Sequence, residues 1–271
     1  YLASTINSLA TIGGSTEVLN SGTGNVSRVY LANQGSATFN GDVKLSNNSS
    51  SNNSQIYSNY HSTSNNTYNE NIVVESYDTN CDGILFGNGN GAATLAANKT
   101  VTIGTNGFIA GELMFRNFTQ IGATMQTLNL LATGTGRFTN YDSDWGGNVN
   151  FSGPRMITRG TRYRGTAYLE KTNASSDASN GGNTFMGVTE LKNTGIGYFL
   201  MGNGDPDIFQ SNLTMNNLGS HNMYLGYNSA GNTVAGDLNI NNATTGTSSG
   251  NLYISGNSAS TVSIAGNVTL N

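Results

Sequence analysis

One stretch of this sequence occurs twice, at positions about 195 residues apart. Val29-Tyr30-Leu31-Ala32 returns as Met223-Tyr224-Leu225-Gly226, and Gly41-Asp42-Val43-Lys44-Leu45 returns as Gly236-Asp237-Leu238-Asn239-Ile240. The two copies overlap over residues 1–75 and 197–271. A long internal period is typical of repeat proteins, whose units pack mainly against their neighbours. We therefore expect residues 1–271 to form one continuous segment of about 1.4 repeats, with both ends continuing into a longer chain.

A shorter pattern recurs within the long repeat: Gly or Asn, an acidic or amide residue, apolar residues at alternate positions, and a final Asn. Residues 41–47 and 236–242 follow this pattern closely. Apolar residues at every second position indicate strands, and the flanking Gly and Asn residues indicate turns. The spacing from Leu213 to Leu238 and on to Val268 suits one coil of a β-solenoid at each step.

Strands of a second kind fall between these blocks, for example at residues 29–31, 84–87 and 252–256. Two or three short strands per coil would stack into parallel sheets around a narrow apolar core. The sequence thus predicts an all-β fold, a right-handed parallel β-solenoid (β-helix) with coils of roughly 22–30 residues. At about 4.8 Å per coil, about ten coils would make a rod about 50 Å long. Seven phenylalanines are expected in its core: Phe86, Phe108, Phe115, Phe151, Phe185, Phe199 and Phe209.

The composition fits this prediction, since the chain has 42 Asn and 36 Gly, and only 10% of its residues are charged. Ordinary globular domains carry about 25% charged residues, so this surface is polar through amides and hydroxyls. Asn tolerates the left-handed backbone conformation at corners, and stacked Asn side chains can form hydrogen-bonded ladders along successive coils. Disorder would also explain the composition, but the hydrophobic residues fall at strand spacing. Only Ser46 to Asn66 is expected to form a loose or decorated edge.

Several short segments carry a family resemblance. They are Gly-Ala-Ala-Thr-Leu-Ala (91–96), Gly-Gly-Asn-Thr-Phe (181–185), Leu-Lys-Asn-Thr-Gly (191–195), Gly-Asn-Gly-Asp-Pro-Asp-Ile-Phe (202–209) and Tyr-Leu-Gly-Tyr-Asn-Ser-Ala-Gly-Asn (224–232). These segments resemble the repeat units of giant surface adhesins of Bacteroidota that are exported by the type IX secretion system. That group includes gliding-motility adhesins and the grappling-hook fibres of predatory filamentous relatives. The resemblance implies an exported extracellular fibre at the cell surface, and it supplies no catalytic residues.

Two pairs of carboxylates, Asp142 with Asp144 and Asp205 with Asp207, are each separated by a single intervening residue. In an extended strand each pair would lie on one face, although Pro206 places a turn within the second pair. Paired carboxylates can bind Ca²⁺ through hard oxygen ligands, or do acid and base chemistry in β-helical polysaccharide enzymes. They also cap turns in segments such as Gly-Asp-Pro-Asp. The sequence leaves all three interpretations open and names these four residues as calcium candidates.

Basic residues cluster in one short segment, where five of the eleven Lys and Arg residues of the chain lie. They are Arg155, Arg159, Arg162, Arg164 and Lys171. A positive stripe on a rod of net charge −4 could dock on an acidic neighbouring chain or an anionic cell-surface glycan. The same residues could equally form a solvated face. The acidic chain, with a pI near 5.0, argues against a nucleic-acid partner.

No segment has the run of about 20 apolar residues that spans a membrane. The single Cys81 is expected to be a small core or loop residue, with an intermolecular disulfide as the alternative. The long repeat, the predicted solenoid and the family resemblance together favour a structural or adhesive segment of a giant extracellular fibre. We expect it not to be an enzyme and to have no cofactor, with Ca²⁺ as the alternative. Its partners would be copies of itself in a multi-stranded fibre, cell-surface glycans or a target cell. The alternative is a β-helical protein that binds or degrades polysaccharides.

Overall fold

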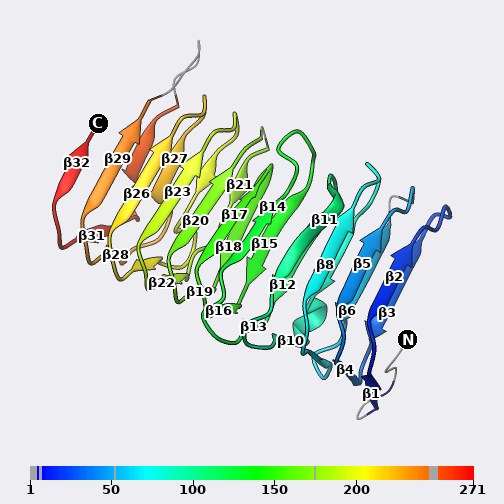
Figure 1. Ribbon diagram of the computed structural model, residues 1–271. Helices are drawn as coiled ribbons and strands as arrows, with labels where there is room; N and C mark the ends of the chain where they lie inside the picture. Colours follow the sequence, from blue (N-terminus) through cyan, green and yellow to red (C-terminus); the bar gives the residue numbers. More distant parts are fainter. Residues whose placement is uncertain (1–4, 6–7, 52, 174, 244–249) are drawn as a thin grey trace.

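The chain winds into coils of three short strands, and each strand pairs in parallel with its counterparts in the coils before and after it. The computed structural model describes residue 5 and residues 8–51, 53–173, 175–243 and 250–271. Figure 1 shows the stacked coils running from one end of the molecule to the other. The predicted all-β parallel solenoid is therefore confirmed. Within the described residues the one helical element is a short 3-10 turn, η1 (Asn88–Asn90).

The strands form three faces, of which face 2 is a single sheet of eleven strands. Its strands are β1 (Leu9–Ile12), β4 (Ser36–Phe39), β7 (Asn65–Tyr68), β10 (Ala92–Leu95), β13 (Phe118–Gln120), β16 (Asp144–Trp145), β19 (Arg162–Tyr163), β22 (Thr184–Phe185), β25 (Ile208–Phe209), β28 (Asn232–Val234) and β31 (Val262–Ile264). The sheet has no interruption, so backbone hydrogen bonds connect the first described coil to the last.

Face 1 consists of a six-stranded sheet followed by a four-stranded sheet. Its strands are β3 (Ser27–Ala32), β6 (Ser54–Asn59), β9 (Gly83–Phe86), β12 (Glu112–Arg116), β15 (Arg137–Tyr141), β18 (Arg155–Arg159), β21 (Asp177–Ala178), β24 (Phe199–Leu200), β27 (Met223–Gly226) and β30 (Leu252–Ser255). Side chains bridge the break between β18 and β21. The N–H of Met156 donates to Asp177 Oδ2 at 3.1 Å, and the N–H of Thr158 donates to Ser179 Oγ at 3.1 Å.

Face 3 consists of a four-stranded sheet followed by a seven-stranded sheet. Its strands are β2 (Thr16–Asn20), β5 (Val43–Asn47), β8 (Ile72–Ser76), β11 (Val101–Phe108), β14 (Gln126–Asn129), β17 (Val149–Gly153), β20 (Ala167–Lys171), β23 (Thr189–Asn193), β26 (Leu213–Asn217), β29 (Leu238–Asn242) and β32 (Val268–Leu270). Here too a side chain bridges the break, because the N–H of Val101 donates to Gln126 Oε1 at 2.8 Å.

Coil length varies more than the sequence predicted. On face 2, Asn232 pairs with Val262 across a long coil, whereas Asp144 pairs with Arg162 across a much shorter one. The lower bound predicted for the coil length was therefore wrong for the coil that ends near Arg162. Variation of this kind falls in the corner loops, because the paired strands keep their register from coil to coil.

The interior is filled by rows of aromatic and aliphatic side chains that stack along the axis. Tyr163, Phe185 and Phe209 lie one above the other, with ring centroids 4.8 Å and 4.6 Å apart and nearly parallel planes. All seven phenylalanines predicted for the core are at most 1% exposed. Burial of each such side chain contributes about 1.5–3 kcal/mol to stability. Cys81 is also buried, as the sequence predicted, and its thiol is free.

The Asn that ends the sequence pattern closes the corner between face 3 and face 1. Its side-chain amide donates to a backbone carbonyl a short way further along the chain, as from Asn20 to Ser27, Asn47 to Ser54 and Asn217 to His221. Asn193, Asn217 and Asn242 also bond to one another along the axis, at 3.3 Å and 3.2 Å. The predicted amide ladder is therefore present, and it explains why the pattern ends on Asn.

The segment from Ser46 to Asn66 is not the loose edge that its composition predicted. It contributes β6 to face 1, and Ser54, Ser58 and Asn59 are fully buried. The hydroxyl of Ser58 lies 2.6 Å from that of Tyr68 inside the solenoid. Small polar side chains fit the interior because each one finds a partner in the same coil or the next, which composition alone does not reveal.

Candidate functional site

The outer surface of face 1 carries a cluster of tyrosines near the N-terminal end, which we call the N-terminal tyrosine cluster: Tyr30, Tyr57 and Tyr60. Tyr30 and Tyr57 are neighbours in register, and their rings stack at 4.9 Å with planes 12° apart. Tyr60 lies 5.1 Å from both rings and nearly perpendicular to them. It is 38% exposed, whereas Tyr57 is 5% exposed. Burial raises the pKa of Tyr57 to about 12, so its hydroxyl is neutral at physiological pH and donates to Gln55 Oε1.

A second group on the same face is the C-terminal tyrosine cluster: Tyr198, Tyr224, Tyr227 and Tyr253. Tyr224 and Tyr253 stack at 4.7 Å with planes 9° apart, and Tyr227 lies edge-on to Tyr224 at 5.1 Å. Asn222 and Asn251, which immediately precede β27 and β30, each donate an amide N–H to the hydroxyl of the tyrosine two residues further along, Tyr224 and Tyr253 respectively, at 3.1 Å in both cases. These bonds fix the orientation of the stacked rings.

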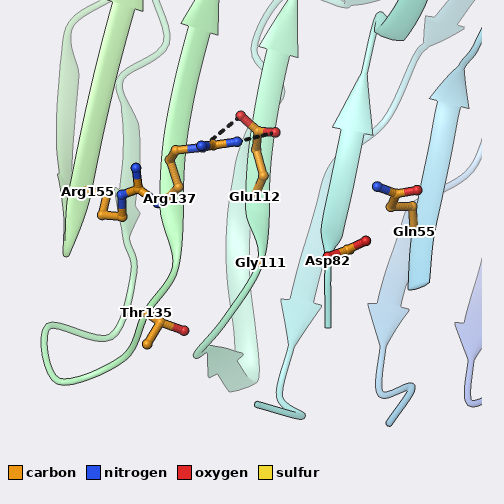
Figure 2. Close-up of a pocket in the computed structure, with 7 residues that line it drawn as sticks. All are labelled: Gln55, Asp82, Gly111, Glu112, Thr135, Arg137 and Arg155. Atoms are coloured by element: carbon orange, nitrogen blue, oxygen red, sulfur yellow. Dashed lines mark hydrogen bonds and ion pairs between the residues drawn. The ribbon is translucent and has the colours of Figure 1, made fainter. Parts of the chain in front are cut away.

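A polar pocket of about 260 Å³ lies on face 1 beside the N-terminal tyrosine cluster. Figure 2 shows its lining, in which Arg137 reaches across to Glu112 while Asp82 and Gln55 lie on the other side. Arg137 Nε and Nη2 lie 3.0 Å and 2.9 Å from the two oxygens of Glu112. Glu112 also accepts a hydrogen bond from Thr139 Oγ1 at 2.6 Å, so this carboxylate is held firmly in place.

The pocket exists because glycine interrupts the row of side chains between Gln55 and Glu112. Gly83 takes this position with φ +136°, and a Cβ there would lie 2.1 Å from the carbonyl oxygen of Glu112. Any other residue would therefore force the two coils apart. Asp82 precedes this glycine, and burial raises the pKa of its carboxyl, with Arg28 acting in the opposite direction.

The first pair of calcium candidates occupies the corner between faces 1 and 2. Asp142 is exposed and adopts a left-handed conformation with φ 52°. Asp144 is held by Arg164 through two hydrogen bonds of 2.7 Å and lies 3.5 Å from Arg162. The arginines therefore already occupy both oxygens of Asp144.

The second pair is divided between the surface and the interior. Asp205 is exposed, whereas Asp207 is fully buried. Asp207 accepts hydrogen bonds from the N–H and the side-chain amide of Asn183 and from the N–H of Gly202, at 2.8–2.9 Å. Burial raises its pKa to about 6, against the effect of these bonds. The close spacing does not place this pair on one face, because the turn at Pro206 lies between them.

Among the described residues, no group of three or more His, Cys, Asp or Glu side chains is arranged to hold a metal ion. Calcium binding thus stays a prediction, which a calorimetric Ca²⁺ titration would test. None of the described residues belongs to a helix that is long and apolar enough to cross a membrane.

The five clustered basic residues are spread around one coil instead of forming a stripe on one face. Arg155 and Arg159 lie on β18 of face 1, Arg162 and Arg164 on or beside β19 of face 2, and Lys171 at the end of β20 on face 3. Arg155 Nε lies 3.0 Å from Oδ1 of Asp177, which is buried. Lys171 is also buried, and burial lowers its pKa to about 8. Arg159 remains exposed at the surface.

The residues of the polar pocket and the tyrosine clusters could not be placed from the sequence. A usable signal existed, since Tyr30 and Tyr57, like Glu112 and Arg137, are separated by one coil length. Recognising it required knowing which residues of each strand point outward. Comparisons with known proteins add no relative: no family model, no curated protein and no solved structure matches this chain.

Proposed function

We propose that this chain is a structural segment of a giant extracellular fibre that attaches a cell to surfaces or to other cells. The observation that carries this proposal is the unbroken eleven-stranded sheet of face 2, which links all described coils along one axis. A continuous hydrogen-bonded ladder and a continuous stacked core resist bending, since every coil is fixed to both neighbours. Such a rod suits reach and mechanical strength.

The finer features of the proposal come from the sequence. Parallel crossover connections are nearly always right-handed, which favours a right-handed solenoid. The long repeat of about 195 residues would set the length of the fibre by its copy number. The resemblance to type IX-secreted adhesins of Bacteroidota supports a position outside the cell, at its surface.

Immunogold labelling tests the location and the role together. Antibodies raised against the purified chain should decorate filaments on intact producing cells, and their Fab fragments should reduce attachment of those cells to a surface. Label confined to the cell interior, or attachment unchanged at saturating Fab, would contradict the proposal. Fab fragments against an unrelated surface protein of the same cells provide the control.

Lateral association of several chains is part of the same proposal. The surface carries few charges, so little repulsion opposes the approach of a second rod. Light scattering across a concentration series should show side-by-side oligomers that grow with concentration. A mass that stays monomeric at the highest concentration would remove the multi-stranded fibre from the proposal.

Polysaccharide binding is the second candidate function, and the tyrosine clusters of face 1 favour it. Exposed tyrosines present apolar ring surfaces and hydroxyl groups together, a combination that suits sugars and protein interfaces. Polysaccharide degradation has weaker support, since Glu112 of the polar pocket is held by Arg137 and Thr139. Release of reducing ends from a polysaccharide, lost in Asp82→Asn, would establish a degrading enzyme.

A further inference from the structure

The two tyrosine stacks occupy equivalent places in the long internal repeat. Tyr30 corresponds to Tyr224 and Tyr57 to Tyr253, at the same offset as the repeat itself. Both stacks lie on the outside of face 1, and their ring separations are 4.9 Å and 4.7 Å. The inward neighbours of these tyrosines, such as Leu31, belong to the core instead. The stack is therefore an outward feature that recurs with the repeat.

Each stack is completed by a third tyrosine set at a steep angle to it. Tyr60 follows Tyr57 just beyond the end of its strand, Tyr227 follows Tyr224 in the same way, and each lies 5.1 Å from its stack. In the N-terminal tyrosine cluster the edge-on ring, Tyr60, belongs to the later of the two coils that form the stack. In the C-terminal tyrosine cluster the edge-on ring, Tyr227, belongs to the earlier of the two coils. The combination of a stack and an edge-on ring is thus kept although the residue that supplies it changes.

The groups around the C-terminal tyrosine cluster are amides, hydroxyls and the ring of His221, whose centroid lies 3.8 Å from that of Tyr198. Asn222 and Asn251 hold the tyrosine hydroxyls, and the groups that act on the pKa of Tyr224 are Asn222 and the other tyrosines of the cluster. At the N-terminal tyrosine cluster the charges that act on the pKa of Tyr57, those of Arg28 and Asp82, are opposite in sign. Neither cluster therefore presents a charge of a single sign to a strongly charged partner. An uncharged ligand with both apolar and hydroxyl surfaces matches these groups better.

We propose that each tyrosine cluster binds the pyranose rings of an uncharged polysaccharide. The apolar face of a pyranose packs on the exposed tyrosine rings, and its hydroxyls bond to the flanking Asn and Gln amides. This inference deepens the proposed attachment function and rests on it. The clusters lie eight coils apart on one face, a distance of about 40 Å, so one polysaccharide chain can engage both.

Binding to a panel of soluble uncharged polysaccharides tests the proposal: hydroxyethyl cellulose, xyloglucan, galactomannan, laminarin and dextran. Affinity electrophoresis and calorimetry would compare wild type with Tyr30→Ala/Tyr60→Ala, with Tyr224→Ala/Tyr253→Ala and with the four-residue variant. Tyr77→Ala is the matched control, since Tyr77 belongs to neither cluster. Far-UV circular dichroism and melting temperature would establish that each variant folds.

We expect wild type and Tyr77→Ala to migrate more slowly in affinity electrophoresis when the gel contains at least one of these polysaccharides. Loss of one cluster should halve the number of sites and weaken binding at least about tenfold, because two linked sites bind a polymer far more tightly than one. The folded four-residue variant should not bind. Equal binding by the four-residue variant and Tyr77→Ala would overturn the proposal, as would no binding by wild type to any member of the panel.

Self-association separates the remaining explanation. If the tyrosine variants change only the oligomer mass in light scattering, the clusters are contacts between copies of this chain and the proposal is wrong. Failure of this kind leaves the fibre function standing, provided that Fab fragments still block cell attachment. If wild type binds no polysaccharide and Fab fragments also fail to block cell attachment, the attachment function on which the proposal rests is wrong as well.

Discussion

The corner between face 3 and face 1 is closed in two ways along the rod. In the C-terminal coils Asn193, Asn217 and Asn242 lie above one another and bond through their side-chain amides. One coil earlier, the same position holds Lys171, which pairs in register with Asn193 and is equally buried. Its ammonium donates to the carbonyl of Asn173, near the buried Asp177.

The difference shows why amides dominate this chain. An Asn side chain both donates and accepts, so identical residues can satisfy one another in successive coils. A buried ammonium only donates, and it must be compensated by acceptors that the neighbouring coils do not repeat. Asp207 is the equivalent case at the corner between face 1 and face 2. Its carboxylate accepts a hydrogen bond from the N–H of Asn183, and its own N–H donates to Oδ1 of Asn232. The coils that contain Lys171 and Asp207 therefore differ from their neighbours in having a buried ionisable side chain. These two side chains should make the stability of the protein depend on pH.

Removal of an amide from the ladder should have the largest effect. In Asn217→Ala the carbonyl of His221 and the buried side chain of Asn193 lose a partner, as does the exposed side chain of Asn242. Each buried unsatisfied group costs about 1–3 kcal/mol, so we expect a loss of about 3–4 kcal/mol in urea unfolding. Asn216→Ala, next to it on the outward side of the strand, is the control and should cost much less. Equal losses would show that the ladder is not the source of stability.

The buried carboxyl of Asp207 should make stability fall with rising pH. Its pKa is about 6 in the native state against an ordinary 3.8, so the native state holds the proton more tightly. The contribution of Asp207 to stability is therefore fully present below about pH 4 and is lost between about pH 4 and 6, by at most about 3 kcal/mol. Asp207→Asn should lose this pH dependence in urea titrations at several pH values, while the exposed-site variant Asp205→Asn keeps it. A wild-type slope in Asp207→Asn would contradict the assignment.

Lys171 should produce the opposite slope at alkaline pH. Its pKa of about 8 lies below the ordinary 10.5, so the unfolded state binds the proton more tightly. Native stability should rise between about pH 8 and 10, by about 2 kcal/mol after allowance for solvent screening. The variant Lys171→Asn places at this position the residue that its register partner Asn193 already has. Its free energy of unfolding should not rise over this pH range. Lys192→Asn, on the outer side of the next strand, should retain it, and loss of the rise in this variant as well would contradict its assignment to Lys171.

The smallest effect on stability is expected for the surface charges of the short coil that runs from Asp144 to Arg162. Arg164→Ala removes the ion pair with Asp144, which lies at the surface. Solvent and salt screen such pairs, so the unfolding midpoint should match wild type in about 0.5 M NaCl and differ only slightly at low salt. A large, salt-independent loss would show that this coil depends on its charges as the others depend on amides.

Most of the fold followed from the sequence, because period-two apolar residues and the final Asn of each block both have direct structural causes. The strands at Leu213, Leu238 and Val268 pair in the register that their spacing predicted. Two features did not follow. The inward Ser and Asn residues of β6 resemble disordered sequence until their partners in other coils are known. The sequence left open whether the basic residues around Arg155 form one stripe or a solvated face, and an unusually short coil carries them across all three faces.

The tyrosine clusters show a further limit of sequence reasoning. Tyr68 and Tyr57 lie in neighbouring strands of similar composition, yet Tyr68 stacks inside on Phe39 while Tyr57 stacks outside on Tyr30. Which way a side chain points depends on where each corner ends, and corner lengths vary from coil to coil. Outward tyrosines can be assigned only after the register is fixed.

Negative-stain electron microscopy of the native material from the producing cells is the most direct test of the central claim. We expect long, uniform filaments, with several parallel strands along them and label from antibodies against this chain. Isolated compact particles that carry the same label would contradict a structural fibre and would leave a discrete polysaccharide-binding protein as the better account.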